Sequence, residues 1–125
     1  MTPEDRLAER GLALPELRRP AGNYRGWMRA ADLLYLSGQG ADGHFGRLGA
    51  DLTVIEGYAV AQVVQVRGFV TSTSDFTDQP GVIDGASDLF AAVFGDRGPH
   101  ARTAIGVAAL PRGFAVEVDA VLLVR

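Results

Sequence analysis

The chain has 125 residues, of which 47% are apolar and 22% charged, with a formal net charge of −3 at pH 7. These values are typical of one small globular domain, and an acidic balance argues against general affinity for nucleic acid. No apolar run approaches the roughly 18 residues of a membrane-spanning helix, and the absence of cysteine excludes disulfides and favours a reducing, cytoplasmic location.

The N-terminus has the features of a helix start. In Thr2-Pro3-Glu4-Asp5 the threonine is a favoured N-cap, proline suits the first helical position, and the acids favour the positive end of the helix dipole. Gly11 is expected to end this helix. The polar start lacks an apolar leader segment, so secretion is not indicated. We expect residues 1–22 to form a helical and extended arm on a single domain of residues 23–125.

Two strands and a glycine-rich loop are predicted next. Residues 23–28 and 33–39 have the composition of strands, with a hairpin near residues 29–32. Glycines between residues 38 and 49 then mark a long loop. Their spacing includes G-x-G-x-x-G, but no helix opens directly behind it and the chain has no lysine for a P-loop, so a nucleotide site is not predicted.

The middle of the chain alternates helix and strand signals. Thr53-Val-Ile-Glu56 is a capping box that predicts a helix start, and residues 63–71 have the pattern of a strand. Residues 82–95 carry apolar side chains at helical spacing, which is typical of an amphipathic helix on a core. His44 and His100 have no second ligand at metal spacing, so each is interpreted as a loop or surface histidine and no metal site is predicted.

The C-terminal part of the chain predicts two strands, 101–109 and 114–124. The segment Leu110-Pro-Arg-Gly113 between them has the composition of a tight turn, so we expect an antiparallel hairpin. The pairs would then be Arg102 with Val121, Ala104 with Asp119, and Gly106 with Glu117. All six side chains would share one face of the sheet, because side chains alternate along a strand.

That face has two interpretations. It is either a solvated outer face with an arginine–carboxylate pair, or a recessed polar site. In the second case Ala104 and Gly106 leave room, and Arg102 presents a fork of donors to a carboxylate. Arg102 and Glu117 would lie about 13 Å apart along the ladder, at about 3.3 Å per residue. Cooperation between them therefore predicts the participation of a second subunit.

Two motifs resemble the signatures of a known family. Residues 101–121 contain an arginine followed by threonine at a strand start, then a Leu-Pro turn, then Val-Glu-Val-Asp in the closing strand. Leu33-Leu-Tyr-Leu-Ser-Gly-Gln39 is an apolar strand ending in Ser-Gly-Gln. Both are similar to signatures of the YjgF/YER/Rid family of reactive intermediate deaminases, also called endoribonuclease L-PSP. The resemblance covers most of the chain from Tyr24 onward and is nearest to a less studied, RidA-like branch.

The resemblance implies an α+β, chorismate-mutase-like fold with the element order ββ-α-β-α-ββ. It also implies a barrel-like homotrimer with sites in the clefts between subunits. Relatives have a longer helical segment before the strand at 63–71. Residues 40–62 still exceed the dozen or so residues that a crossover between parallel strands needs, so a shortened helix is one explanation. The alternative is that a segment of the chain is missing from the sequence at this point.

The implied activity is hydrolysis of reactive enamine and imine acids, such as 2-aminoacrylate, to 2-keto acids and ammonia, without a metal or organic cofactor. At the matching positions, Arg102 would bind the substrate carboxylate and Glu117 would position or deprotonate the attacking water. Tyr24, Ser37 and Gly38 would line the substrate pocket.

This chain departs from the family pattern at two positions. The cysteine of many active members is Ala104 here, and residues 84–87 offer no clear match for a helix asparagine of active relatives. One alternative function is a trimer that captures small carboxylates at Arg102 without turnover. A third hypothesis, RNA cleavage, ranks last because the chain is acidic, has no lysine and shows no acid–base pair suited to that reaction.

Overall fold

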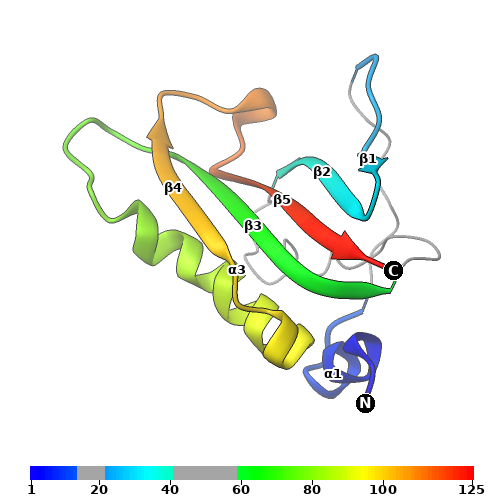
Figure 1. Ribbon diagram of the computed structural model, residues 1–125. Coiled ribbons are helices and arrows are strands. Elements are labelled where there is room, and N and C mark those ends of the chain that lie inside the picture. The colour runs from blue at the N-terminus through cyan, green and yellow to red at the C-terminus, as the bar shows by residue number, and fades with distance from the viewer. Residues whose placement is uncertain (14–21, 41–58) are drawn as a thin grey trace.

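The computed structural model describes residues 1–13, 22–40 and 59–125 as a mixed α+β fold (Figure 1). In chain order the elements are α1 (Pro3–Glu9), β1 (Trp27–Ala30), β2 (Leu33–Gly40), β3 (Val60–Thr71), α3 (Gln79–Phe94), the 3-10 turn η1 (Gly95–Arg97), β4 (Ala101–Val107), the 3-10 turn η2 (Pro111–Gly113) and β5 (Val116–Val124). This order agrees with the predicted α+β fold. The expected first helix of the ββ-α-β-α-ββ pattern, its capping box and most of the glycine-rich loop lie outside the described residues.

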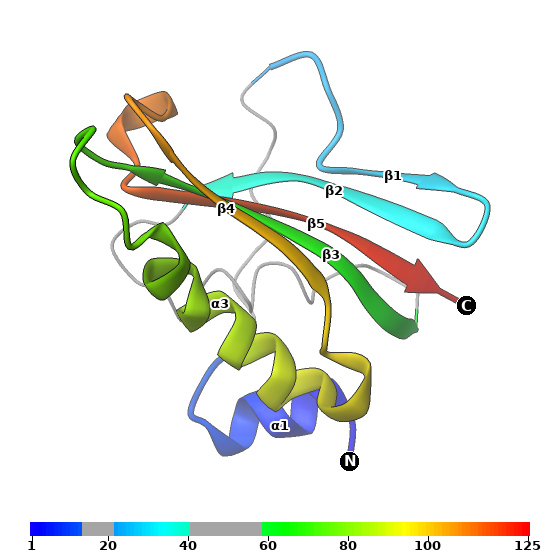
Figure 2. The ribbon, with the colours of Figure 1, turned by 60° about the vertical axis from the view of Figure 1, so that its left-hand side comes forward.

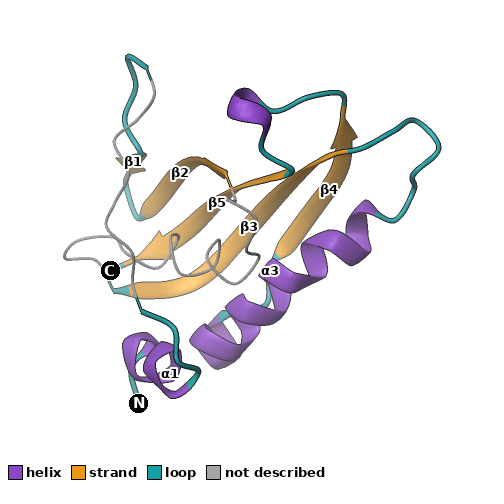
Figure 3. Cartoon of the chain, turned by 180° about the vertical axis from the view of Figure 1, so that it is seen from behind, coloured by secondary structure: helices purple, strands orange, loops and turns teal. Residues whose placement is uncertain are grey.

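The five strands form one sheet in the order β1-β2-β5-β3-β4. Strands β3 and β4 are parallel and are connected through α3, whereas the other neighbouring pairs are antiparallel. Helices α1 and α3 lie on the same side of the sheet (Figures 2 and 3). We call this side the covered face and the opposite side the open face. Within the described residues, no α-helix lies on the open face.

The predicted hairpin between the last two strands is wrong. Strand β3 lies between β4 and β5, parallel to the first and antiparallel to the second. The predicted turn instead forms η2, in which Arg112 and Gly113 have φ of 58° and 70°. The long, valine-rich β3 is an interior strand of the sheet, and both of its edges are paired. A local turn motif contains no information about a third strand that inserts between its two arms.

The hydrophobic core lies between the covered face and α3. The helix buries one apolar stripe, as its spacing predicts: Ile83, Ala86, Phe90, Val93 and Phe94. Strand β5 buries every second residue from Val116 to Val124. Gly68 in β3 allows the helix to approach, because a Cβ there would lie 2.4 Å from the side chain of Ile83. None of the described helices combines the length and hydropathy of a membrane-spanning segment.

Helix α1 begins as predicted. Thr2 is the N-cap: its hydroxyl accepts from the Asp5 N–H at 3.1 Å, and the Asp5 carboxylate accepts from the Thr2 N–H at 2.8 Å. Leu7 is buried in the core, and Arg6 donates to the carbonyl of Val93 at 3.0 Å near the end of α3. The helix is therefore packed against the rest of the protein by both apolar and polar contacts.

The first hairpin begins later than predicted. Strand β1 is Trp27–Ala30 instead of residues 23–28. The preceding segment is held by Ser37 of β2, whose N–H donates to the carbonyl of Gly26 at 2.8 Å and whose hydroxyl donates to the carbonyl of Arg25 at 2.6 Å. These bonds replace a regular ladder at the start of the hairpin.

Candidate functional site

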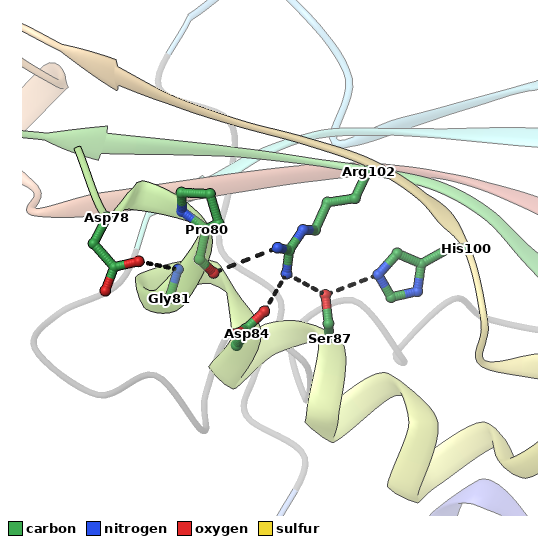
Figure 4. A network of polar contacts seen from close by, with 7 residues as sticks. All are labelled: Asp78, Pro80, Gly81, Asp84, Ser87, His100 and Arg102. Carbon is green, nitrogen blue, oxygen red and sulfur yellow. Dashed lines mark hydrogen bonds and ion pairs between the residues drawn. The ribbon is translucent and has the colours of Figure 1, made fainter.

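Arg102 lies on the edge strand β4, and its side chain extends over the covered face to α3 (Figure 4). Its Nη1 donates to Asp84 Oδ1 at 2.7 Å and to Ser87 Oγ at 3.1 Å, and its Nη2 donates to the carbonyl of Pro80 at 3.4 Å. Within the described residues these bonds engage three of the five guanidinium N–H groups. The side chain is 23% exposed, so a further acceptor can reach the others.

His100 forms a short hydrogen bond to the same serine. Its Nε2 lies 2.9 Å from Ser87 Oγ, and its Nδ1 lies 2.7 Å from the carbonyl oxygen of Gly98. Because a carbonyl only accepts, Nδ1 carries the proton in the neutral ring, and Nε2 accepts from the Ser87 hydroxyl. The ring also packs edge-on against buried Phe90, with centroids 5.7 Å apart. His100 therefore lies in a loop, as predicted, but it is half-buried and both of its ring nitrogens form hydrogen bonds.

The topology explains why these side chains meet. The connection from β3 through α3 to the parallel β4 makes the helix run opposite to β4. Helix residue numbers therefore rise as strand numbers fall, so that Asp84 meets Arg102 and Ser87 meets His100. The sequence contained part of this signal, since Asp84, Ser87 and Asp88 are spaced three and four residues apart on one helix face. The hairpin prediction concealed the pairing.

A shallow surface depression of about 400 Å³ opens over this group. Its polar lining comes from Asp84, Ser87 and Asp88 of α3, from His100, and from Arg102 of β4. Arg102 therefore does not present a free fork, because Asp84 already balances its charge. A carboxylate ligand would either displace Asp84 or bind to the remaining guanidinium N–H groups.

A second group of predicted residues gathers at the end of β2, on the open face. Glu117 of β5 lies over Gly38, where a Cβ would be only 2.8 Å from the Glu117 Cδ. Glycine at this position leaves the space that the carboxylate occupies. Ser37 is adjacent, and its hydroxyl is bound to the carbonyl of Arg25. Tyr24 lies just before this anchored segment, and its side chain is exposed.

Within one chain, the structure does not bring Arg102 and Glu117 together. Arg102 is level with Val66 of β3 on the covered face, whereas Glu117 is level with Phe69 and belongs to the open face. Two strand spacings of about 4.8 Å and three rises of about 3.3 Å place their Cα atoms about 14 Å apart. The prediction that they share one face is wrong. Their separation within a chain is confirmed, although for a different reason.

Ala104 and Gly106 do not form the predicted recess beside Arg102, because neither residue lines the depression over Arg102. A Cβ on Gly106 would lie 2.7 Å from Gln79 Nε2 and from Ser72 Oγ, so these side chains fill the space above the glycine. Ala104 packs against the core. The small residues of β4 therefore accommodate α3 and its N-terminal loop.

Asp119 pairs with an arginine other than the predicted one. Arg67 of β3 donates two hydrogen bonds to the Asp119 carboxylate, from Nε to Oδ1 at 2.9 Å and from Nη2 to Oδ2 at 2.6 Å. The hydrogen bonds and charge of Asp119 raise the pKa of Arg67 further. This ion pair is on the open face, and Arg67 is more than half exposed. Within residues 1–13, 22–40 and 59–125, no three histidine or acidic side chains gather closely enough to hold a metal ion.

Comparisons with known proteins place this fold in a family. Residues 50–124 match the family model described as Endoribonuclease L-PSP. Protein TCP17 of Trypanosoma cruzi is 40% identical over 144 residues, covering 93% of this chain and 90% of that protein. The alignment is longer than this chain, so the relative has residues without a counterpart here.

Solved structures agree with this match. A protein of unknown function from Agrobacterium tumefaciens is 31% identical with a TM-score of 0.83, covering 98% of this chain and 92% of that one. RidA from an Antarctic Psychrobacter is 24% identical with a TM-score of 0.65, covering 86% and 94%, and shows the likeness of the fold. The chain therefore belongs to the endoribonuclease L-PSP family, the YjgF/RidA family that its two sequence signatures resemble.

Proposed function

We propose that this protein hydrolyses small imines and enamines that carry a carboxylate, of the 2-aminoacrylate type, to 2-keto acids and ammonia. The observation that carries the proposal is the position of the Arg102 guanidinium, which lines an open depression. Its described hydrogen bonds use three of its five N–H groups, so two N–H groups can donate to a ligand. A planar donor fork suits a carboxylate, and holding the carboxylate orients the adjacent imine carbon. An imine is already electrophilic, so the reaction needs no cofactor.

The role of Glu117 in this proposal depends on a second subunit. Glu117, Gly38, Ser37 and Tyr24 gather at one end of the open face, away from Arg102. We place them against the Arg102 depression of a neighbouring chain, in a homotrimer, where Glu117 orients the attacking water. The exposed apolar side chains of the open face, Met28, Tyr35, Val64 and Ile105, are suited to contact another subunit.

A coupled assay tests this proposal. A PLP-dependent dehydratase generates 2-aminoacrylate or 2-iminobutyrate, and release of the keto acid is followed with and without the protein. Arg102→Ala and Arg102→Lys are expected to abolish the acceleration, because lysine keeps the charge but loses the fork. Arg10→Ala, at the C-terminal cap of α1, is the matched control and should leave the rate unchanged. A folded wild type without any acceleration would reject hydrolysis of these substrates.

Capture of small carboxylates without turnover is the second candidate. It is favoured by the position of Glu117 on the opposite face from Arg102, since binding needs only the arginine. Calorimetric titration with pyruvate separates the two functions. Binding that needs Arg102 and tolerates Glu117→Gln, in a protein that does not accelerate hydrolysis, would establish capture.

A further inference from the structure

We propose that Ser87 and His100 form a proton-transfer pair that accepts the proton of the attacking water beside Arg102. This inference rests on the proposed hydrolysis and adds to it a residue pair that the family signatures do not include. Glu117 then orients water from a neighbouring subunit, while the proton acceptor belongs to the same chain as the carboxylate anchor.

The hydrogen bonds have a defined direction. In the neutral ring the Gly98 carbonyl holds the proton on Nδ1, 2.7 Å away, so Nε2 is the acceptor. The Ser87 hydroxyl therefore donates to Nε2 at 2.9 Å and itself accepts from Arg102 Nη1 at 3.1 Å. Such a chain of bonds is polarised in one direction, from the guanidinium through the hydroxyl to the imidazole.

Ser87 Oγ is also placed to meet a substrate. A hydroxyl oxygen has two lone pairs, and Arg102 occupies one of them. The other remains for a water molecule or a substrate in the depression that Ser87, His100 and Arg102 line together. A carboxylate held by Arg102 brings its adjacent imine carbon toward this hydroxyl, because only one bond separates the two carbons.

The ring of His100 is restrained from two sides. Its edge-on contact with Phe90 and its bond to Gly98 fix the plane of the imidazole, so Nε2 stays directed at Ser87. The charged groups that line the depression with it are Asp84 and Asp88 of α3 and Arg102 of β4.

The proton balance of the reaction is complete with this pair. Water attacks the protonated imine carbon, the C–O bond forms, and the π electrons of C=N move to nitrogen. The proton of the water passes to Ser87 Oγ as the serine proton passes to His100 Nε2. The imidazolium returns that proton through the hydroxyl to the amino nitrogen. The C–N bond then breaks, the carbonyl forms, and ammonia leaves with the remaining hydroxyl proton as ammonium.

The experiment compares kcat, KM and the pH profile of hydrolysis in the same coupled assay. His100→Gln and Ser87→Ala are each expected to lower kcat about 100-fold, the lower end of general acid–base catalysis, with little change in KM. The double variant should lose no more than either single one, because the two groups act as a unit. Ser87→Thr keeps the hydroxyl and should retain activity, and Ser74→Ala in an exposed loop is the control.

The pH profile separates proton transfer from a merely structural role. In the wild type kcat should fall at acidic pH, where the imidazole is already protonated, and this limb should disappear in His100→Gln. An active wild type whose His100→Gln and Ser87→Ala variants keep its kcat and its acid limb would overturn the inference and leave the proposed hydrolysis intact. An inactive, folded wild type would overturn both. Thermal unfolding of each variant confirms that it is folded.

Discussion

The two faces of the sheet differ in how they hold the chain together. The covered face holds the hydrophobic core, and at its edge Arg102 of β4 and His100, in the loop just before β4, form hydrogen bonds with α3. The open face mixes a solvated ion pair, Arg67 with Asp119, with exposed apolar side chains. The candidate chemistry therefore lies where a helix meets a sheet edge, because polar side chains can contact both elements there and still reach water.

The largest difference between the faces should be in the stability lost when a matched pair of isoleucines is replaced by alanine. Ile83 is fully buried beneath the sheet, whereas Ile105 on the open face is 45% exposed. Ile83→Ala is expected to lower the free energy of unfolding by about 2–5 kcal/mol, because it removes buried methylenes and leaves a cavity. Ile105→Ala should change it by no more than about 0.5 kcal/mol in an isolated chain. Urea unfolding of both variants measures the contrast.

Protein concentration sharpens this comparison. If subunits associate through the open face, the effect of Ile105→Ala should grow with concentration while that of Ile83→Ala stays constant. Equal losses for the two variants at the lowest measurable concentration would contradict the assignment of Ile105 to an exposed surface.

A smaller effect is expected from the ion pair at the covered edge. Asp84 is 59% exposed and occupies the Arg102 guanidinium with one short bond. Asp84→Asn should tighten binding of pyruvate about 1.4- to fivefold, because an exposed pair contributes about 0.2–1 kcal/mol that a ligand no longer has to replace. Asp88→Asn in the same depression is the control for charge alone. Weaker binding in Asp84→Asn would show that Asp84 orients Arg102 for the ligand instead of competing with it.

The smallest expected effect is on the pH dependence of stability and comes from the N-terminal cap of α1, which packs on the covered side. The hydrogen bonds from the backbone and hydroxyl of Thr2 lower the pKa of Asp5 below its ordinary value of 3.8. A lowered folded-state pKa stabilises the protein above the unfolded value, and this contribution is lost as the pH falls through the folded value. At neutral pH the wild type should therefore have a slightly higher melting temperature than Asp5→Asn. This difference should disappear well below pH 3.8. Glu9→Gln, at the other end of α1, should show no such convergence.

The local signals of the sequence predicted the elements well. The N-cap at Thr2, the apolar stripe of α3 and the alternation of β5 each depend on residues a few positions apart, and each is confirmed. The two signatures likewise identified the family, because they are contiguous in the chain. The late start of β1 was missed because Ser37 binds the segment before it, across a distance of twelve residues.

The site was less predictable. Arg102 and Glu117 were assigned to one face because the Leu-Pro turn predicted a hairpin, and the insertion of β3 placed them on opposite faces. The same insertion makes α3 a crossover between parallel strands, which brings Ser87 to His100.

By itself the sequence determined α1, α3, most strand positions, the family and the identity of the polar side chains, since all of these follow from neighbours along the chain. Only the tertiary structure decided which strand lies between β4 and β5, which carboxylate pairs with each arginine, and which hydroxyl meets the imidazole. Those outcomes depend on burying the long apolar strand β3 with both edges paired, a requirement that belongs to the whole sheet and to no single segment of it.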